Sequence, residues 1–378
     1  MTCAARNARK NCVNQRRASS GSGEAIETQD FGGGERQPLA VSRNRTVAVY
    51  GAYGHTGRFV VAELCRRGWT PILSGRNAGK LAALGKVFPG LERRLASIED
   101  AMSLDCALSG AMGVINCAGP FLDTAQPVIE AALRARIHYL DLCAEQQAVL
   151  DVFTRFSDEA RRAEVMVIPA MAFYGGLADL LATAALGGWP DADLIEIAVA
   201  LDSWHPTTGT RLTGARNHHR RLVVSSGRLE PLADPPPSRQ WTFAAPFGSQ
   251  EMVGLPLSEI ITLSRHVRSA EVHSYMNLAP LRDLHDPLTP APTPADAHGG
   301  SSQLFAVDVV VQRGGQTRTA AAQGRDIYAA SAPLVVEALQ RIGDGRSKKA
   351  GVVAPGEAFN SRDFLQSLAA LHVKLPEA

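Results

Sequence analysis

Apolar strand-like segments and helical segments alternate regularly between residues 46 and 188. The segments 47–50 and 113–116 are almost continuously apolar, which is typical of strands buried on both faces. Segments with helical periodicity separate them, so the pattern predicts a doubly wound α/β domain with a parallel sheet. The expected strands cover 46–50, 70–74, 92–98, 113–117, 137–142 and 165–169. The expected helices cover 56–67, 77–86, 124–134, 145–163 and 177–186.

The pattern changes after residue 189, where strands follow one another without regular helices between them. This change predicts a second, α+β domain over 189–326, built on a mixed or antiparallel sheet. Gly314 and Gly315 indicate a hairpin, and the proline-rich stretch 280–300 indicates a mobile loop. The expected strands of this domain cover 195–204, 270–275, 304–312 and 316–324.

The two ends of the chain differ from these domains. Residues 1–45 carry five basic residues before the first acidic one, Glu24, and lack the apolar segment of a secretory signal. We expect a disordered tail there, with an organelle transit peptide or a start codon placed too early as alternatives. Residues 327–378 show helical patterns at 328–342 and 359–371, which we expect to return to the first domain or to the junction.

Composition narrows the class of protein. Of the 378 residues, 45% are hydrophobic and 20% are charged, which is typical of a soluble globular protein. A net charge of +2 gives no case for a nucleic-acid or membrane-surface partner. Pro169 and the pair Gly175 and Gly176 interrupt the most apolar stretch, so no integral membrane span is expected. Six cysteines without C-x-x-C spacing indicate reduced thiols, a cytoplasmic location and no metal site.

A glycine-rich loop with the spacing G-x-x-G-x-x-G follows the first strand. Gly51 permits a tight turn, Gly54 lets the backbone approach a pyrophosphate, and Gly57 lets helix and strand pack closely. The helix that follows offers free N–H groups and the positive end of its dipole to phosphates. The loop therefore predicts a dinucleotide site, the alternative being a turn that needs glycine only for its shape. The predicted contacts in this loop are Gly51, Tyr53, Gly54, His55, Thr56 and Gly57.

The second strand ends at Ser74 and leads into Arg76 and Asn77. An NAD site usually places an acidic residue here to bind the ribose 2′-hydroxyl, and this chain has none nearby. The guanidinium of Arg76 can instead pair with a 2′-phosphate and stack on adenine, so NADP(H) is favoured over NAD. The alternative is that Arg76 is a solvated surface charge. Asn77 is included in the predicted cofactor site and can also cap the next helix.

The central strand 113–117 ends in Cys117, Ala118, Gly119 and Pro120. Small residues at the carboxyl end of such a strand leave space for a ligand at the topological switch point. We expect these four residues near the nicotinamide ribose, the alternative being a strand-to-helix turn that needs glycine for its shape alone.

Together these segments resemble the saccharopine dehydrogenase-like NADP-binding family, and most closely its saccharopine dehydrogenase-like oxidoreductases and trans-acting enoyl reductases. The strongest likeness lies in VAVYGAYGHTGRFVVAEL, LSGRNAGKLAAL, VINCAGPF, PVIEAALRARIHYLDLCAE and MAFYGGLADLLA, with looser likeness in TGTRLTGA, YAASAPLVVEAL and VVAPGEAF. The resemblance implies a Rossmann NADP-binding domain over 46–188, a substrate domain over 189–326, and NADP(H) as cofactor. Ala144 stands where family members often have glycine, which weakens any transfer of a role to Glu145.

Several mechanisms are excluded by missing residues. No tyrosine has a lysine four residues later, and no lysine lies between residues 87 and 347, so a Tyr/Lys pair and a Schiff base in the second domain are unsupported. Neither H-E-x-x-H nor G-x-S-x-G occurs. Hydride transfer remains, in which the cofactor carries the reactive group and the protein orients it.

The sequence leaves the proton donor open. Tyr139, Asp141 and Tyr174 are the catalytic candidates, because they lie at or after the carboxyl ends of expected strands. Asp141 could instead cap a helix. Weaker candidates, each with a structural alternative, are Glu145, Asp179, His205, His218 and His219.

We therefore predict an NADPH-dependent oxidoreductase that transfers hydride to a C=C, C=N or C=O bond of a small or thioester-linked substrate. A homodimer is possible. The alternative is a non-catalytic NADP(H)-binding sensor or adaptor, which the lack of a recognisable acid–base motif favours.

Overall fold

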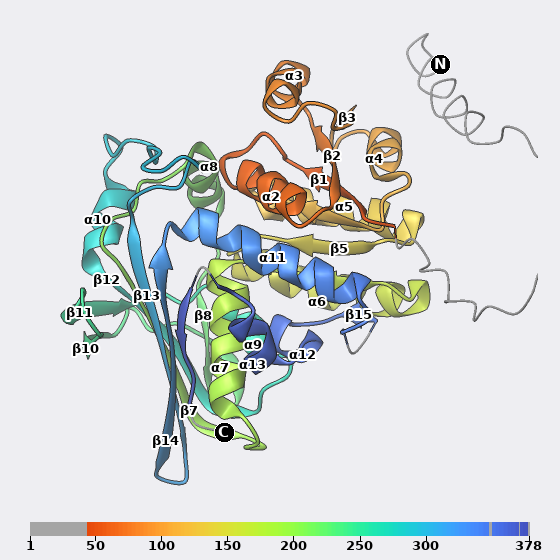
Figure 1. The fold of residues 1–378 in the computed structure, drawn as a ribbon. Coiled ribbons are helices and arrows are strands. Elements are labelled where there is room, and N and C mark those ends of the chain that lie inside the picture. Colours follow the sequence, from red (N-terminus) through yellow and green to blue (C-terminus); the bar gives the residue numbers. More distant parts are fainter. Residues whose placement is uncertain (1–43, 348–349, 370, 377–378) are drawn as a thin grey trace, which may run out of the picture. The chain divides into compact units, whose positions relative to one another are not determined.

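The computed structural model describes residues 44–347, 350–369 and 371–376, so almost all of the tail predicted over 1–45 lies outside the described residues. A parallel sheet with the strand order β15-β6-β5-β4-β1-β2-β3 forms the first domain (Figure 1). The predicted doubly wound sheet is therefore confirmed. Its strands are β1 (Thr46–Tyr50), β2 (Thr70–Gly75), β3 (Arg93–Leu95), β4 (Gly113–Asn116), β5 (His138–Asp141), β6 (Met166–Ile168) and β15 (Gly351–Val352).

Five helices connect the strands of this sheet. They are α2 (His55–Arg66), α3 (Ala78–Val87), α4 (Ala101–Leu108), α5 (Phe121–Ala135) and α6 (Gln146–Ala163). Asn77 caps α3 as expected, because its Oδ1 accepts the N–H of Lys80. The sequence prediction missed α4, whose first turn is capped by the carboxylate of Asp100.

The second sheet is mixed, as predicted, with the order β10-β11-β12-β7-β13-β14-β16. Strands β7 and β12 run parallel, whereas the other pairs are antiparallel, including the hairpin that turns at Gly314 and Gly315. The strands are β7 (Ala192–Leu201), β8 (Leu222–Ser225), β9 (Arg228–Pro231), β10 (Ser238–Thr242), β11 (Ser249–Gly254), β12 (Ser269–Asn277), β13 (Leu304–Arg313), β14 (Gln316–Arg325) and β16 (His372–Lys374).

Several short elements in this part of the chain differ from the prediction. The first residues of the expected loop 280–300 belong to a helix, α10, and a helix expected over 359–371 is much shorter. Asn360 caps that helix at its start. Residues 372–374, beyond its end, pair with the free edge of β14 as strand β16. The remaining helical elements are the π-helix η1 (Phe173–Leu177), α7 (Ala178–Leu186), α8 (Thr208–Arg216), α9 (Ser258–Leu263), α10 (Leu278–His285), α12 (Pro355–Ala358) and α13 (Ser361–Gln366).

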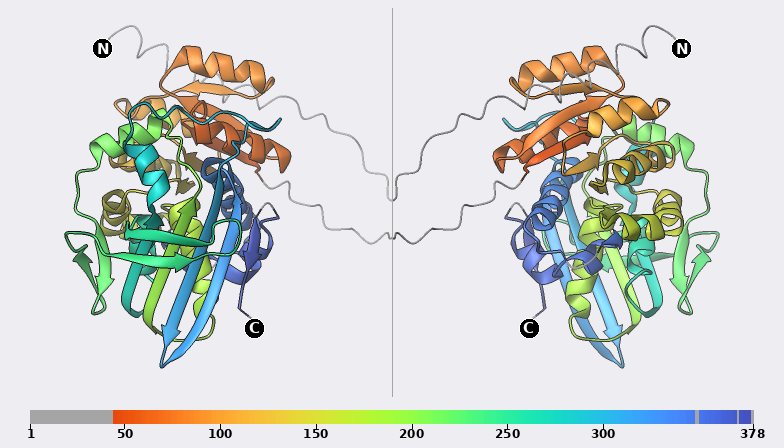
Figure 2. Two further views of the ribbon diagram at one scale, coloured as in Figure 1. Left: turned by 90° about the vertical axis from the view of Figure 1, so that its left-hand side faces the viewer. Right: turned by 90° about the vertical axis from the view of Figure 1, so that its right-hand side faces the viewer.

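Helix α11 (Ile327–Gly343) joins the two sheets. In views at right angles it lies between the first-domain strands and the long strands of the second sheet (Figures 1 and 2). Its apolar residues share one core with residues of both sheets, among them Val49 of β1 and Ile197 of β7. Among the described residues, no helix combines the length and apolarity needed to cross a membrane.

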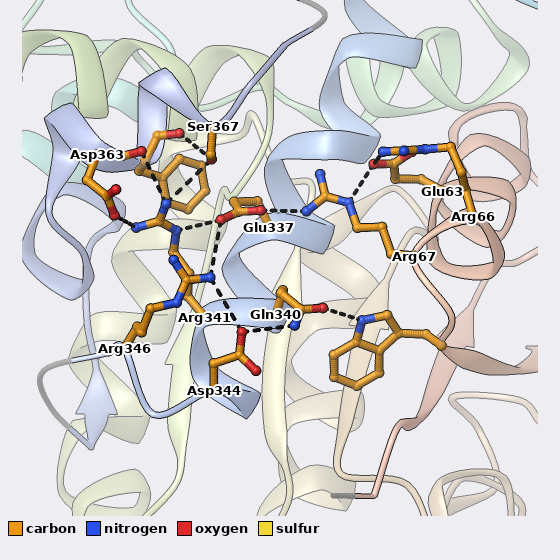
Figure 3. Close-up of polar contacts among 12 residues, drawn as sticks. Glu63, Arg66, Arg67, Glu337, Gln340, Arg341, Asp344, Arg346, Asp363 and Ser367 are labelled. Carbon is orange, nitrogen blue, oxygen red and sulfur yellow. Dashed lines mark hydrogen bonds and ion pairs between the residues drawn. The ribbon is translucent and has the colours of Figure 1, made fainter.

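A chain of ion pairs holds α11 against its neighbours (Figure 3). The guanidinium of Arg341 is 2% exposed and binds Glu337 and Asp363, which ties α11 to α13. The other oxygen of Glu337 accepts from Arg67, next to α2, and Arg67 also binds Glu63 on α2. The C-terminal residues are thus fastened to the helix that follows the glycine-rich loop.

Candidate functional site

The loops after β1, β2 and β4 meet at the carboxyl edge of the first sheet. The N–H of Gly51 donates to the carbonyl oxygen of Ser74 at 2.9 Å, which ties the first loop to the second strand. Gly51 has φ +81°, and a Cβ on it would lie 2.9 Å from the Cβ of Ala118 in the third loop. The structure therefore brings the three predicted cofactor segments together.

The start of α2 has the shape that a diphosphate needs. No side chain caps the helix at Gly54, so its first backbone N–H groups are not covered by a cap. A Cβ on Gly57 would lie 2.4 Å from the carbonyl oxygen of Gly51, so only glycine permits this approach of helix and loop. Thr56 lies in the first turn, half-buried.

His55, the first residue of α2, faces the domain junction. Its ring packs edge-on against Phe59 and Tyr328, with centroid separations of 5.3 and 5.2 Å. Its Nε2 is buried without a hydrogen-bond partner among the described residues. Burial lowers the pKa of His55, and Arg58 adds to this effect while Asp326 opposes it.

An aromatic ring and two cations lie beside the end of β2. The ring of Tyr53 lies over Gly75, where a Cβ would come within 2.6 Å of it, and the Nζ of Lys80 lies 5.8 Å from the ring centroid. Arg76 is exposed, and none of the hydrogen bonds and ion pairs found among the described residues involves its guanidinium. This exposed group is therefore free to meet a ligand phosphate.

Two buried polar atoms beside these loops bear on whether a dinucleotide fits there. The Nε2 of His55 and the Oγ of Ser74 are both buried and lack hydrogen-bond partners among the described residues. Buried polar atoms are normally satisfied by protein, water or ligand. Together with the bare start of α2, these residues fit a bound dinucleotide, whose phosphates would lie at Gly54 and whose adenosine would lie towards Arg76.

The loop after β4 has a fixed shape. The Oδ1 of Asn116 accepts the N–H of Ala118 at 3.0 Å, and the hydroxyl of Thr124 donates to the carbonyl oxygen of Ala118 at 2.6 Å. Glu145 accepts the N–H of Phe121 at 3.0 Å, at the start of α5. Cys117, Ala118, Gly119 and Pro120 are thus held beside the glycine-rich loop.

Tyr139 and Asp141 lie beneath this edge. Tyr139 is fully buried and donates to the Oδ2 of Asp141 at 2.8 Å, while the Oδ1 of Asp141 accepts the N–H groups of Cys143 and Ala170. Burial raises the pKa of Asp141 to about 6. These contacts support a role in holding the backbone of two loops, and a direct part in proton transfer stays a prediction.

Tyr174, the third catalytic candidate, lies on η1 between the domains. Its hydroxyl is buried without a hydrogen-bond partner among the described residues, and its ring centroid is 6.0 Å from that of Trp204. The indole N–H of Trp204 donates to the hydroxyl of Tyr328, which also contacts Thr210. Tyr174 is thereby connected to His55 through Trp204 and Tyr328.

The sequence analysis missed two residues near Tyr174. Glu259 on α9 is 2% exposed, and burial raises its pKa to about 7. Arg221, just before β8, donates to the carbonyl oxygen of Pro256 at 2.9 Å. A sequence signal for Glu259 existed, because it is the one acidic residue in the otherwise apolar or uncharged stretch 252–264.

Helix α8 covers the loop after β4. The Oγ1 of Thr213 lies 3.1 Å from the position of a Cβ on Gly119, and Arg216 pairs with Asp123 of α5. None of the residues in α8 is buried, so polar contacts hold it in place. Of the histidines considered above, His205 lines a cavity of about 40 Å³ beside Tyr328, while His218 and His219 are exposed after α8.

Asp179 has a partner that the sequence did not reveal. The Nε2 of His266 lies 2.8 Å from the Oδ1 of Asp179, which is fully buried and also accepts from Thr183. A Cβ on Gly356 would come within 2.5 Å of the same oxygen, so α12 closes over the pair. The charge of Asp179 raises the pKa of His266 against the opposing effect of burial.

This pair predicts a pH-dependent stability. A histidine whose pKa is raised by folding stabilises the fold fully below its unfolded pKa of about 6.5, and the contribution is lost as the pH rises through the folded pKa. We expect the unfolding free-energy difference between wild type and His266→Gln to shrink from pH 5.5 to pH 9. Urea denaturation at several pH values measures it, and a difference that grows with pH would contradict the ion pair.

Known proteins share parts of this architecture. Residues 47–168 match the family model described as the saccharopine dehydrogenase NADP binding domain. Curated relatives include saccharopine dehydrogenase-like oxidoreductases of Bos taurus and Homo sapiens, which are 28% and 29% identical over 152 residues. Each match spans 35% of this chain and 35% of the relative, so only about a third of the relatives' length is covered.

A solved structure extends the likeness beyond that domain. Apo saccharopine dehydrogenase (L-Glu forming) from Saccharomyces cerevisiae aligns with a TM-score of 0.62 at 12% identity, covering 87% of this chain and 98% of that chain. At this identity the match shows a shared fold across both domains. The family resemblance noted in the sequence is confirmed.

Proposed function

We propose that the protein is an NADP(H)-dependent oxidoreductase, because residues 47–168 match the model of the saccharopine dehydrogenase NADP binding domain. The curated relatives carry the name oxidoreductase, and residues of the second half of the chain pack against the loops where the cofactor would bind. We propose hydride transfer to a C=C, C=N or C=O bond of a small or thioester-linked substrate. The bound cofactor would supply the hydride, and the residues of this chain would bind, orient and protonate.

The observation that carries this proposal is the bare start of α2 among three closely packed loops. Gly54 and Gly57 leave room for a diphosphate, and the two unpartnered buried atoms of His55 and Ser74 lie beside it. Stopped-flow measurement of NADPH oxidation against enoyl thioesters, imines and ketones tests the activity. Turnover with one of these classes is expected, and none with all three would refute it.

One observation favours the sensor or adaptor alternative. Helix α8 lies over Gly119, and the polar groups nearest the junction are buried. A crystal structure with NADP bound discriminates the two functions. Side chains filling the space over the nicotinamide C4 would favour the sensor, while displacement of α8 to leave an open space would favour the enzyme.

Charge reversal at Arg76 should change the cofactor preference. We expect Arg76→Glu to weaken NADPH binding by about 100-fold and NADH binding by less than about 3-fold, because only NADPH carries the 2′-phosphate. Fluorescence titration with each cofactor measures this. Arg93→Glu, on the neighbouring strand β3, is the matched control. Equal loss for both cofactors would remove Arg76 from the 2′-phosphate role.

A further inference from the structure

Three segments far apart in sequence bring the polar side chains of Tyr174, Glu259 and Arg221 near one another at the domain junction. A Cβ on Gly175, which follows Tyr174, would lie 2.9 Å from the Oγ of Ser258, which precedes Glu259. The π-helix η1 and α9 therefore touch at these residues. Arg221 joins them, because its guanidinium donates to the carbonyl oxygen of Pro256 at 2.9 Å.

The polar atoms of this group are incompletely satisfied. The Oε1 of Glu259 accepts the N–H of Leu257 at 2.8 Å, and its Oε2 makes no geometrically satisfactory hydrogen bond among the described residues, although the hydroxyl of Ser274 on β12 lies near enough to lower the pKa of the carboxyl. The hydroxyl of Tyr174 also lacks a partner within that part of the chain. Arg221 is largely buried, yet none of the ion pairs found among the described residues includes it. Two unpartnered groups beside a buried cation indicate that a ligand completes the site.

The chemistry of the group indicates what that ligand offers. Arg221 presents only donors to a ligand, the hydroxyl of Tyr174 can donate one hydrogen bond, and a protonated Glu259 can donate another. Three converging donors suit an oxygen that accepts hydrogen bonds and develops negative charge, as a carbonyl oxygen does during reduction. The surroundings of Tyr174 also fit a functional site, since π-helical turns occur frequently at such sites.

We propose that Glu259 is the proton donor of the reaction and that Tyr174 and Arg221 hold the carbonyl oxygen that receives this proton. This inference rests on the proposed oxidoreductase function. In the reduction of a ketone or aldehyde, a bound NADPH would supply the hydride to the carbonyl carbon, and the C=O π pair would move to the oxygen. The oxygen takes the proton from the Oε2 of Glu259, which yields the alcohol, and the carboxylate regains a proton from solvent.

The electrostatics of Glu259 agree with this role. Burial raises its pKa to about 7, the range in which a carboxylic acid can give and regain a proton at neutral pH, while Arg221 opposes the shift. Two other buried acids lie on elements packed against α9, and both have other partners. Glu145, at the start of α6, accepts the N–H groups of Phe121 and Leu122, and Asp179 on α7 pairs with His266.

Helix α8 lies where a substrate would have to enter the site. This helix ends at Arg216, five residues before Arg221, and it has no buried residues of its own. Moving this helix would expose little apolar surface. The substrate would then enter beside the loop that follows β4.

The test compares wild type with Glu259→Gln, and Asp308→Asn serves as the control because its carboxyl is also partly buried with a raised pKa and, on β13, accepts from the indole N–H of Trp241. Infrared titration of the cofactor-free protein should show protonated carboxylic-acid absorption that titrates near pH 7, and this absorption should decrease in Glu259→Gln but not in Asp308→Asn. With NADPH and cyclohexanone, kcat should fall by about 100-fold or more in Glu259→Gln, and the loss of wild-type activity above pH 7 should vanish. NADPH affinity should remain unchanged.

The outcomes separate the two proposals. If wild type oxidises NADPH with none of the enoyl thioesters, imines and ketones, the proposed function fails. If wild type is active but Glu259→Gln keeps its kcat and pH profile, or if Asp308→Asn shows the same loss, the assignment of Glu259 is overturned. Turnover with imines or enoyl thioesters alone would overturn the carbonyl assignment. Should Glu259→Gln fail to fold, Tyr174→Phe must lower kcat by about 10-fold or more without changing the NADPH affinity.

Discussion

Replacing Arg341 by alanine is expected to lower the free energy of unfolding by about 3–5 kcal/mol. Arg341 is 2% exposed and binds Glu337 and Asp363, and its removal leaves the buried carboxylate of Glu337 without its main partner on α11 (Figure 3). Breaking one side of a buried ion pair is costly because the remaining charge stays out of water. Urea denaturation followed by circular dichroism measures the change.

Arg346 provides the control for this prediction. It approaches the same Glu337 at 3.7 Å, but its side chain is 45% exposed, so Arg346→Ala should cost less than about 1 kcal/mol. If both variants lost a similar free energy of unfolding, the burial of Arg341 would not explain its contribution to stability. Because Arg67 connects Glu337 to α2, the Arg341 variant should also weaken NADPH binding.

Gly57→Ala is expected to weaken NADPH binding by about 100-fold or more, which corresponds to about 2.7 kcal/mol. The added Cβ would lie 2.4 Å from the carbonyl oxygen of Gly51 and 3.0 Å from that of Ala52, so the loop must move away from α2. The N–H groups at the start of α2 would then no longer point at the diphosphate. Overpacking of this kind should also destabilise the fold by about 1–3 kcal/mol.

Gly188 is the matched control, since no described atom lies within 4 Å of the position of its Cβ. Gly188→Ala should leave both NADPH affinity and stability close to wild type. Isothermal titration calorimetry measures the NADPH affinity of the two variants. Unchanged affinity in Gly57→Ala would mean that the cofactor does not bind at the start of α2.

The sequence alone determined most of the first domain, because that information is local, but it did not reveal strand β15, which comes from residues 351–352. Buried parallel strands appear as continuous apolar runs, and a glycine loop between a strand and a helix needs only neighbouring residues to be recognised. The elements around Gly51, Arg76 and Gly119 could therefore be predicted together with the doubly wound sheet and the family. The mixed second sheet followed from strands that lack connecting helices.

Only the tertiary structure decided which polar groups meet. Glu259 and Tyr174 lie 85 positions apart, and Asp179 and His266 lie 87 apart, so no periodic pattern relates them. The short helix α4 and the strand β16 also depended on context, a cap at Asp100 and the free edge of β14. Secondary structure follows from periodicity along the chain, whereas pairs of buried charged or polar groups form only when separate elements pack and exclude water.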